Sequence, residues 1–262
     1  MSNLGLTVFG IAFIFAMTTM GASLVYFFKG KINEKVNTLF LGFASGIMIA
    51  ASIWSLLLPA IEMSADYGNF KFLPALVGFL SGGVFLILID KLIPHIHKGS
   101  GTEEGVKNHL SKSAKLFLAV TIHNIPEGLA VGFAFGAAAI IGTQAAFLSA
   151  MGLAIGIGIQ NFPEGTTVAL PICSNGASTH KAFLFGTLSG AVEPLFAVIG
   201  YFLASTISAI QPWLLSFAAG AMIFVVAEDL IPDAKIESNP HLGTWGVMIG
   251  FAIMMVLDVA FG

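Results

Sequence analysis

The sequence carries two closely similar segments, HNIPEG at His123 to Gly128 and QNFPEG at Gln160 to Gly165, which begin 37 positions apart. Each segment places a proline and a glutamate inside a long apolar run. A proline cannot donate the backbone hydrogen bond that a helix interior needs, and a buried carboxylate is costly without a partner. Because both unfavourable residue types recur together, the repeat indicates a functional centre rather than two unrelated helix defects.

The composition is typical of a membrane protein. Hydrophobic residues make up 56% of the 262 positions and charged residues only 10%, whereas a soluble domain carries about 25% charged residues. The eleven basic residues are all lysines, and nothing resembles a basic nucleic-acid-binding surface, so we expect no nucleic acid partner. The single Cys173 excludes an internal disulfide and a cluster of thiolate ligands.

Eight apolar runs are long enough to cross the hydrocarbon layer, which takes about 20 helical residues. The predicted fold is therefore an all-α membrane protein, a single polytopic domain over 1–262, with a polar loop at 94–113 after the third span. The predicted spans are 4–28, 38–60, 72–93, 114–139, 144–171, 181–206, 212–232 and 242–261.

The lysines predict how the chain is oriented. Ten of the eleven lie in or beside odd-numbered connections, and Lys71 lies on the opposite side. Lysine and arginine concentrate in cytoplasmic loops of membrane proteins. We therefore predict that the loop 94–113 is cytoplasmic, that both termini lie outside, and that the protein resides in the cell (inner) membrane.

Two pairs of segments indicate an inverted repeat. The spans 114–139 and 144–171, which carry the two motifs, run in opposite directions. FASGIMI at 43–49 resembles FAAGAMI at 217–223, and each is followed, near the end of its span, by a short proline-containing segment, LLPA or LIPDA. Antiparallel repeats of this kind are typical of secondary transporters. Chance similarity between Gly- and Ala-rich apolar segments is the alternative.

Three glutamates, Glu127, Glu164 and Glu193, fall near the middle of their spans. An acidic side chain at the bilayer centre costs ~2.5–3.5 kcal/mol on insertion scales, and no lysine lies at that depth to pair with it. The three glutamates therefore predict a divalent metal centre. The alternative is that a buried His or Glu forms a structural hydrogen bond between helices.

The spacing within each motif supports a metal centre. His123 and Glu127 lie one helical turn apart on one face, as do Gln160 and Glu164. The asparagine that follows His123 or Gln160 lies about 100° further round its helix, where it can serve an adjoining site. Each proline frees one backbone carbonyl, so we expect both helices to be opened where the ion passes. Such mixed ligands suit zinc, iron, manganese or cadmium better than copper(I).

These residues match a known family. The chain resembles the ZIP (Zrt/Irt-like) divalent metal transporters, in particular their GufA-like prokaryotic branch, over essentially its whole length. The HNxPEG and QxxPEG motifs carry the resemblance. It implies a ZIP-like 3+2+3 inverted-repeat bundle, a homodimer, and a transport block of spans one, four, five and six that moves against a scaffold of the other four.

The resemblance also implies a midplane centre for two ions per subunit. The first ion would be held by His123, Glu127, Gln160 and Glu164. The second ion would be held by Asn124, Asn161 and Glu193, with Glu127 and Glu164 as bridges. Some family members carry aspartate at the position of Asn161, so the neutral amide is expected to weaken the second site.

Further residues are candidates for the route of the ion. The alternatives are helix packing, solvated helix ends and, for the loop histidines, a merely polar loop. Those on the outer side recur every seven residues and are Met48, Ser55 and Glu62. Those at the cytoplasmic ends of spans are Asp90, Glu228 and Asp229. Those in the cytoplasmic loop are His95, His97 and His109.

The sequence thus predicts a membrane transporter and not an enzyme. Its partners would be the lipid bilayer and its cargo, Zn²⁺ or else Cd²⁺, Fe²⁺ or Mn²⁺, which it would move toward the cytoplasm by alternating access around the midplane centre. Two alternatives stay open: a metal-selective cation channel with the same site, and an intramembrane metal-dependent hydrolase. The lack of an HExxH motif counts against the hydrolase.

Overall fold

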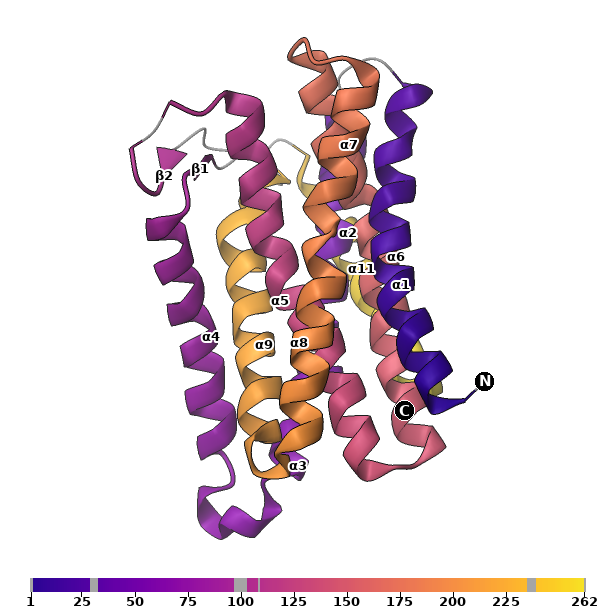
Figure 1. Ribbon diagram of the computed structural model, residues 1–262, viewed down its shortest axis with the longest axis vertical. Helices are drawn as coiled ribbons and strands as arrows, with labels where there is room; N and C mark the ends of the chain where they lie inside the picture. The colour runs from indigo at the N-terminus through magenta and orange to yellow at the C-terminus, as the bar shows by residue number, and fades with distance from the viewer. Residues whose placement is uncertain (1, 29–32, 97–102, 108, 235–238, 262) are drawn as a thin grey trace.

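The chain is largely helical in the computed structural model, which describes residues 2–28, 33–96, 103–107, 109–234 and 239–261. Within these ranges, eight helical segments are long and apolar enough to cross a membrane, which confirms the predicted fold class. Figure 1 shows the segments side by side, with the β1–β2 pair at one end of the bundle.

The membrane-length segments contain these elements in chain order: α1 (Asn3–Ser23) and η1 (Leu24–Tyr26); α2 (Glu34–Ala51), η2 (Ser52–Leu57) and α3 (Leu58–Glu62); α4 (Leu73–Leu92); α5 (Lys112–Ile141); α6 (Gln144–Ser174); α7 (Thr179–Gly190) and α8 (Val192–Thr206); η4 (Ser208–Ile210), α9 (Gln211–Val225), η5 (Val226–Leu230) and α10 (Ile231–Asp233); and α11 (Pro240–Phe261). The connections add the 3-10 helix η3 (Ala65–Phe70) and two short antiparallel strands, β1 (His95–Ile96) and β2 (Glu103–Glu104).

The two motif-bearing helices, α5 and α6, form a tight hairpin. The Ser111 hydroxyl caps α5 by accepting a hydrogen bond from the N–H of Ala114 (3.2 Å), and Thr143 caps α6 in the same way at Ala146 (3.3 Å). Between them, Gly142 ends α5 in the left-handed conformation, with φ 74°, which glycine adopts without steric cost. The hairpin sets HNIPEG and QNFPEG antiparallel to each other.

Both of these helices run unbroken through their motif prolines, Pro126 in α5 and Pro163 in α6. The prediction that the helices are opened there was wrong. A missing N–H frees one carbonyl without breaking the helix, since neighbouring helices support a proline-containing span. The break lies instead in the sixth span, at Ala191 between α7 and α8, two residues before Glu193.

The second and seventh spans are interrupted in matching places. The π-helix η2 ends two residues before Pro59, and the π-helix η5 ends two residues before Pro232. A proline cannot bond to the carbonyl four residues earlier, and the wider turn accommodates this loss. The two interruptions follow FASGIMI and FAAGAMI, so the similarity of these segments extends to their backbone geometry.

The helices pack in four principal pairs, α5 with α8, α1 with α6, α2 with α11, and α4 with α9 (Figure 1). In the predicted inverted repeat, the first three spans exchange with the last three, and the fourth exchanges with the fifth. This exchange converts the α5–α8 pair into the α1–α6 pair, and the α2–α11 pair into the α4–α9 pair. A side chain at Gly250 would collide with the backbone carbonyl of Phe43, and one at Gly82 with that of Phe217. Phe43 and Phe217 begin FASGIMI and FAAGAMI. These contacts fit an inverted repeat, which itself stays a prediction.

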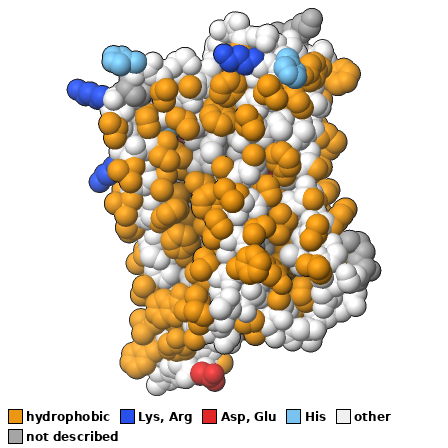
Figure 2. Space-filling model, viewed as in Figure 1, with side chains coloured by type: hydrophobic (Ala, Val, Ile, Leu, Met, Phe, Trp, Pro, Cys, Tyr) orange, Lys and Arg blue, Asp and Glu red, His pale blue; other side chains and the backbone are white. Residues whose placement is uncertain are grey.

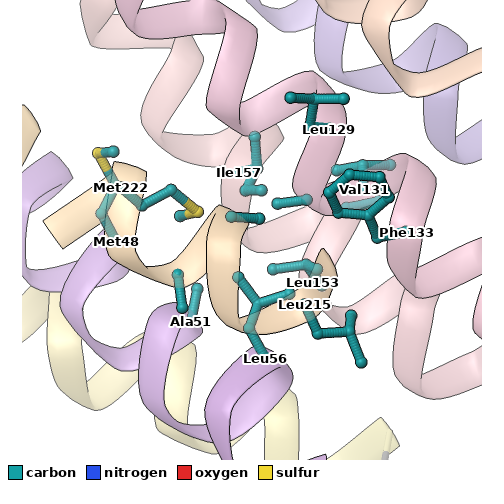
Figure 3. Close-up of a cluster of buried hydrophobic side chains, with 14 of the residues drawn as sticks. Met48, Ala51, Leu56, Leu129, Val131, Phe133, Leu153, Ile157, Leu215 and Met222 are labelled. Carbon is teal, nitrogen blue, oxygen red and sulfur yellow. The ribbon is translucent and has the colours of Figure 1, made fainter. Parts of the chain in front are cut away.

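Apolar side chains cover the sides of the bundle, and charged side chains gather toward its ends. Figure 2 shows lysine and histidine side chains toward one end of the visible face and an acidic side chain at the other. Near the lysine-bearing end, Lys115 contacts Glu103 at 2.6 Å. Inside the bundle, Met48, Ile157 and Leu215 belong to the larger of two clusters of buried apolar residues in the described ranges (Figure 3).

Candidate metal centre

The four residues predicted to hold the first ion line one small cavity. His123 and Glu127 come from α5, and Gln160 and Glu164 come from α6. Residues one turn apart share a helix face, so each helix presents two ligand-type side chains to the cavity. The other walls include residues of α2, α9 and η5. The cavity therefore lies where the motif-bearing hairpin meets the second and seventh spans.

Two carboxyl oxygens at this cavity are buried without a hydrogen-bond partner. Within the described part of the chain, neither Glu127 Oε2 nor Glu164 Oε2 contacts a donor, and these residues are only 1% and 8% exposed. Asn124 Oδ1 is also buried without a partner, but Asn124 does not line this cavity. Leaving a buried polar atom unsatisfied costs about 1–3 kcal/mol, and more if the group is charged. A divalent cation would satisfy such oxygens.

His123 contacts a carboxyl from the seventh span. Its Nε2 lies 3.0 Å from Oδ2 of Asp229 in η5. Both side chains line a second pocket with Glu164 and Asp233, toward the end of the bundle that carries the β1–β2 pair. Asp229 was predicted to lie on the exit route, and the structure brings it against a predicted ligand.

The predicted ligands of the first ion are thus close together but do not form a closed cage. No group of three or more His, Cys, Asp or Glu side chains in the described ranges is arranged to hold an ion. His123 is paired with Asp229 in this conformation, and Gln160 brings an amide to the cavity instead of a carboxyl.

The three residues predicted for the second ion meet in a hydrogen-bonded cluster, which is joined to the cavity by a hydrogen bond from Nε2 of Gln160 to Oδ1 of Asn161 at 2.7 Å. Nδ2 of Asn124 lies 3.2 Å from Oε1 of Glu193, and Nδ2 of Asn161 lies 2.6 Å from Oε2. The Thr18 hydroxyl on α1 adds a third contact, 3.0 Å from Oε1. Sequence reasoning missed Thr18, although two adjacent threonines, Thr18 and Thr19, inside the first apolar run were a signal.

The glycine that ends each motif allows this cluster to form. A side chain at Gly128 would collide with the backbone of Glu193, and one at Gly165 with the backbone of Thr18. Because glycine has no Cβ, α8 approaches α5 closely and α1 approaches α6 closely. The final residue of HNIPEG and of QNFPEG is therefore explained by helix packing, which carries Glu193 and Thr18 to the motif asparagines.

An apolar layer separates the cavity from another pocket, toward the end of the bundle opposite the β1–β2 pair. Along α2, Ala44 lines the cavity, Met48 is fully buried, and Ser55, in the following η2, lines the other pocket. Along α6, Ile157 is fully buried between the cavity and Leu153 of the other pocket. Figure 3 shows Met48, Leu153 and Ile157 in the same apolar cluster.

The predicted outer-side residues have three different surroundings. The Ser55 hydroxyl donates to Oδ1 of Asp258 on α11 at 2.6 Å. Asp258 was missed, although an aspartate inside the last apolar run was a signal. Met48 belongs to the apolar layer, and Glu62 is exposed at the end of α3. The seven-residue spacing therefore does not place the three residues along one open route in this conformation.

The predicted cytoplasmic residues other than Asp229 lie further from the cavity. Asp90 and His95 are both buried and pair with each other, with Oδ1 of Asp90 3.5 Å from Nε2 of His95. Glu228 and His109 are exposed. His97 lies outside the described residues. Among the predicted exit residues, it is Asp229 that reaches a predicted ligand.

Known proteins match almost the whole chain. The family model described as ZIP Zinc transporter matches residues 4–116 and 113–258. The chain is 37% identical over 331 residues to Zinc transporter ZIP11 of Homo sapiens, with 97% of this chain and 96% of that protein covered. It is 37% identical over 257 residues to Zinc transporter GufA of Myxococcus xanthus, with coverage of 96% and 98%. It is 35% identical over 264 residues to Zinc transporter ZIPB of Bordetella bronchiseptica, with coverage of 99% and 82%.

Proposed function

Because the chain belongs to the ZIP zinc transporter family, we propose that it carries Zn²⁺ or a chemically similar divalent ion across the membrane. The resemblance to the GufA-like branch is confirmed by these relatives. They are named as zinc transporters, which agrees with a transporter rather than an enzyme. Cd²⁺, Fe²⁺ and Mn²⁺ accept the same mixture of imidazole, carboxylate and amide ligands and belong to the same proposal.

The bare carboxyl oxygens of Glu127 and Glu164 are the observation that carries the proposal. They are buried at the cavity that His123 and Gln160 also line. A hydrated ion gives up water only where protein oxygens and nitrogens replace it, as in other ion-conducting proteins. The cavity offers two carboxyl groups, an imidazole and an amide for this replacement.

The surroundings of the cavity favour alternating access over a channel. The pocket lined by His123, Glu164 and Asp229 adjoins the cavity toward the lysine-bearing end, whereas Met48 and Ile157 belong to a buried apolar layer on the other side. With the lysine-bearing end in the cytoplasm, this conformation would release the ion inward. The inner-membrane location, the outside termini and the homodimer belong to the same proposal.

His123 would act as the moving ligand. In the ion-bound form its imidazole turns from Asp229 toward Glu127 and completes the first site. When it returns to Asp229, the ion loses a ligand and meets the carboxyls of Asp229 and Asp233, which lie in the pocket beyond. Release then follows from weaker coordination and access to water.

Zinc uptake into proteoliposomes that contain a zinc-sensitive dye tests this function. We expect uptake that saturates with external Zn²⁺, with competition from Cd²⁺, Fe²⁺ and Mn²⁺ ranking the ions. Repeating the assay with and without a pH gradient measures any coupling to protons. Uptake no faster than into protein-free liposomes would contradict transport, and a flux that does not saturate would favour the channel.

A further inference from the structure

The carboxyl of Glu193 already has the neighbours that a cation would otherwise replace. The residue is fully buried, and its two oxygens lie within 3.2 Å of the side chains of Thr18, Asn124 and Asn161. A buried carboxyl surrounded by hydrogen-bond donors is stabilised without an ion. The predicted second ion would have to displace these contacts.

The orientation of both amides is set by their other contacts. Nδ2 of Asn161 also faces the backbone carbonyl oxygen of Ile14, at 3.5 Å. Nδ2 of Asn124 faces the backbone carbonyl oxygen of Ser189, at 3.0 Å. Reversing either amide would set its oxygen against two acceptors, the backbone carbonyl and Glu193. Both amides therefore present N–H groups to Glu193, and an N–H group is no metal ligand; the oxygen of Asn124, which has no hydrogen-bond partner in the described chain, is the one acceptor that these two amides leave unoccupied.

We propose that the cluster around Glu193 is a permanent clamp between helices and not a second ion site, so that each subunit carries one ion at a time. The clamp consists of Thr18, Asn124, Asn161 and Glu193. The proposal rests on the proposed function, because it concerns the number of ions bound for transport. It assigns Thr18 as a positioning residue, which acts by holding the carboxyl of Glu193.

Asn161 decides between a clamp and an ion site. An aspartate at this position has no N–H to donate and would set a second carboxyl against Glu193. Two adjacent carboxyls repel each other and favour a divalent cation between them, whereas a carboxyl with an amide donor does not require one. The oxygen of Asn161 is occupied as well, because it accepts a hydrogen bond from Nε2 of Gln160 at 2.7 Å.

The clamp joins the four spans that the resemblance assigns to the transport block. Thr18 lies on α1, Asn124 on α5, Asn161 on α6 and Glu193 on α8. Because the contacts need no ion, these spans stay connected in both the loaded and the empty transporter. The block can then return without cargo as one body.

The number of bound ions tests the clamp directly. Cd²⁺ binding to the purified full chain in detergent is measured by titration calorimetry, and the metal retained after desalting is quantified. We expect one Cd²⁺ per subunit in the natural sequence and two in Asn161→Asp. Saturable uptake together with two bound ions in the natural sequence would overturn the clamp alone. Neither binding nor uptake would overturn the proposed function, and the clamp with it.

Thermal unfolding in excess chelator tests the same proposal without any ion. Thr18→Val should unfold a few degrees below the natural sequence, and Thr18→Ser should restore stability because it keeps the hydroxyl. Cd²⁺ stoichiometry should stay at one in both variants. Thr19→Val is the matched control, since the hydroxyl of Thr19 has no hydrogen-bond partner in the described part of the chain. Equal unfolding temperatures for Thr18→Val and Thr19→Val would overturn the clamp.

Discussion

Two kinds of buried carboxyl lie on neighbouring helices of this bundle. Glu127 and Glu164 each keep an oxygen that contacts no donor in the described chain, whereas Glu193 lies within hydrogen-bond distance of three side chains. The same signal, a glutamate in the middle of an apolar run, predicts all three. Depth in the membrane therefore identifies a carboxyl that needs a partner. Only the neighbouring donors decide whether that partner is protein or ion.

Replacing Glu127 or Glu164, which each keep an unpartnered carboxyl oxygen, should give the largest effect on zinc uptake. In Glu127→Gln or Glu164→Gln, an anionic ligand is lost, so zinc uptake should fall at least ~100-fold, beyond the 10–100-fold typical of losing an outer-shell partner. The ion-free protein should gain ~1 kcal/mol of stability, because a neutral amide costs less to bury than a carboxylate. Proteoliposome uptake and unfolding in chelator measure the two effects. Undiminished uptake in both variants would refute the first-site assignment.

Replacing Glu193, whose carboxyl lies among three hydrogen-bonding side chains, should lower stability instead of raising it. Glu193→Ala leaves three polar side chains without their partner, and hydrogen bonds between membrane helices average ~0.6 kcal/mol, so we expect a loss of ~1–3 kcal/mol without metal. Unfolding in chelator measures it. The exposed Glu62 provides the control, and Glu62→Ala should unfold as the natural sequence does. A Glu193→Ala protein as stable as this control would show that the contacts of Glu193 do not stabilise the protein. That result would contradict the difference between Glu193 and the other two glutamates.

Weakening the contact between His123 and Asp229 should strengthen ion binding at the first site. Asp229→Asn weakens the contact at 3.0 Å that holds the imidazole of His123 at Asp229. A hydrogen bond of this kind contributes about 1 kcal/mol net, so Cd²⁺ should bind ~5-fold more tightly once the contact is weakened. Titration calorimetry measures this change, and Glu228→Gln at the exposed neighbour should leave affinity unaltered. Weaker binding in Asp229→Asn would instead make Asp229 a direct ligand.

The smallest effect is expected at the far pocket, beyond the apolar layer. Ser55→Ala removes the hydrogen bond to Asp258, which should lower stability by less than about 1.5 kcal/mol and change zinc uptake by less than about threefold. Unfolding temperature and initial uptake rate measure these changes. A loss of uptake as large as that of Glu127→Gln would place Ser55 among the essential ligands.

The spans, and the pairs of ligand-type side chains that share a helix face, were predictable because they depend on neighbours within the chain. A span follows from the length of its apolar run, and the pairs His123/Glu127 and Gln160/Glu164 follow from the helical period. The continuity of α5 through Pro126 and the π-helices η2 and η5 were not predictable in this way. They depend on how adjacent helices support a backbone that has lost one hydrogen bond.

By itself, the sequence determined that the chain crosses a membrane, which residues lie near the middle of its spans, and which family it belongs to. Apolar length and helical spacing are local properties, so they can be read along the chain. Only the tertiary structure decided which carboxyl is surrounded by donors. Thr18 and Glu193 lie 175 positions apart in the sequence, yet their side chains meet at 3.0 Å. Such a contact exists only after α1, α5, α6 and α8 have packed together, because hydrogen bonds act over a few ångströms.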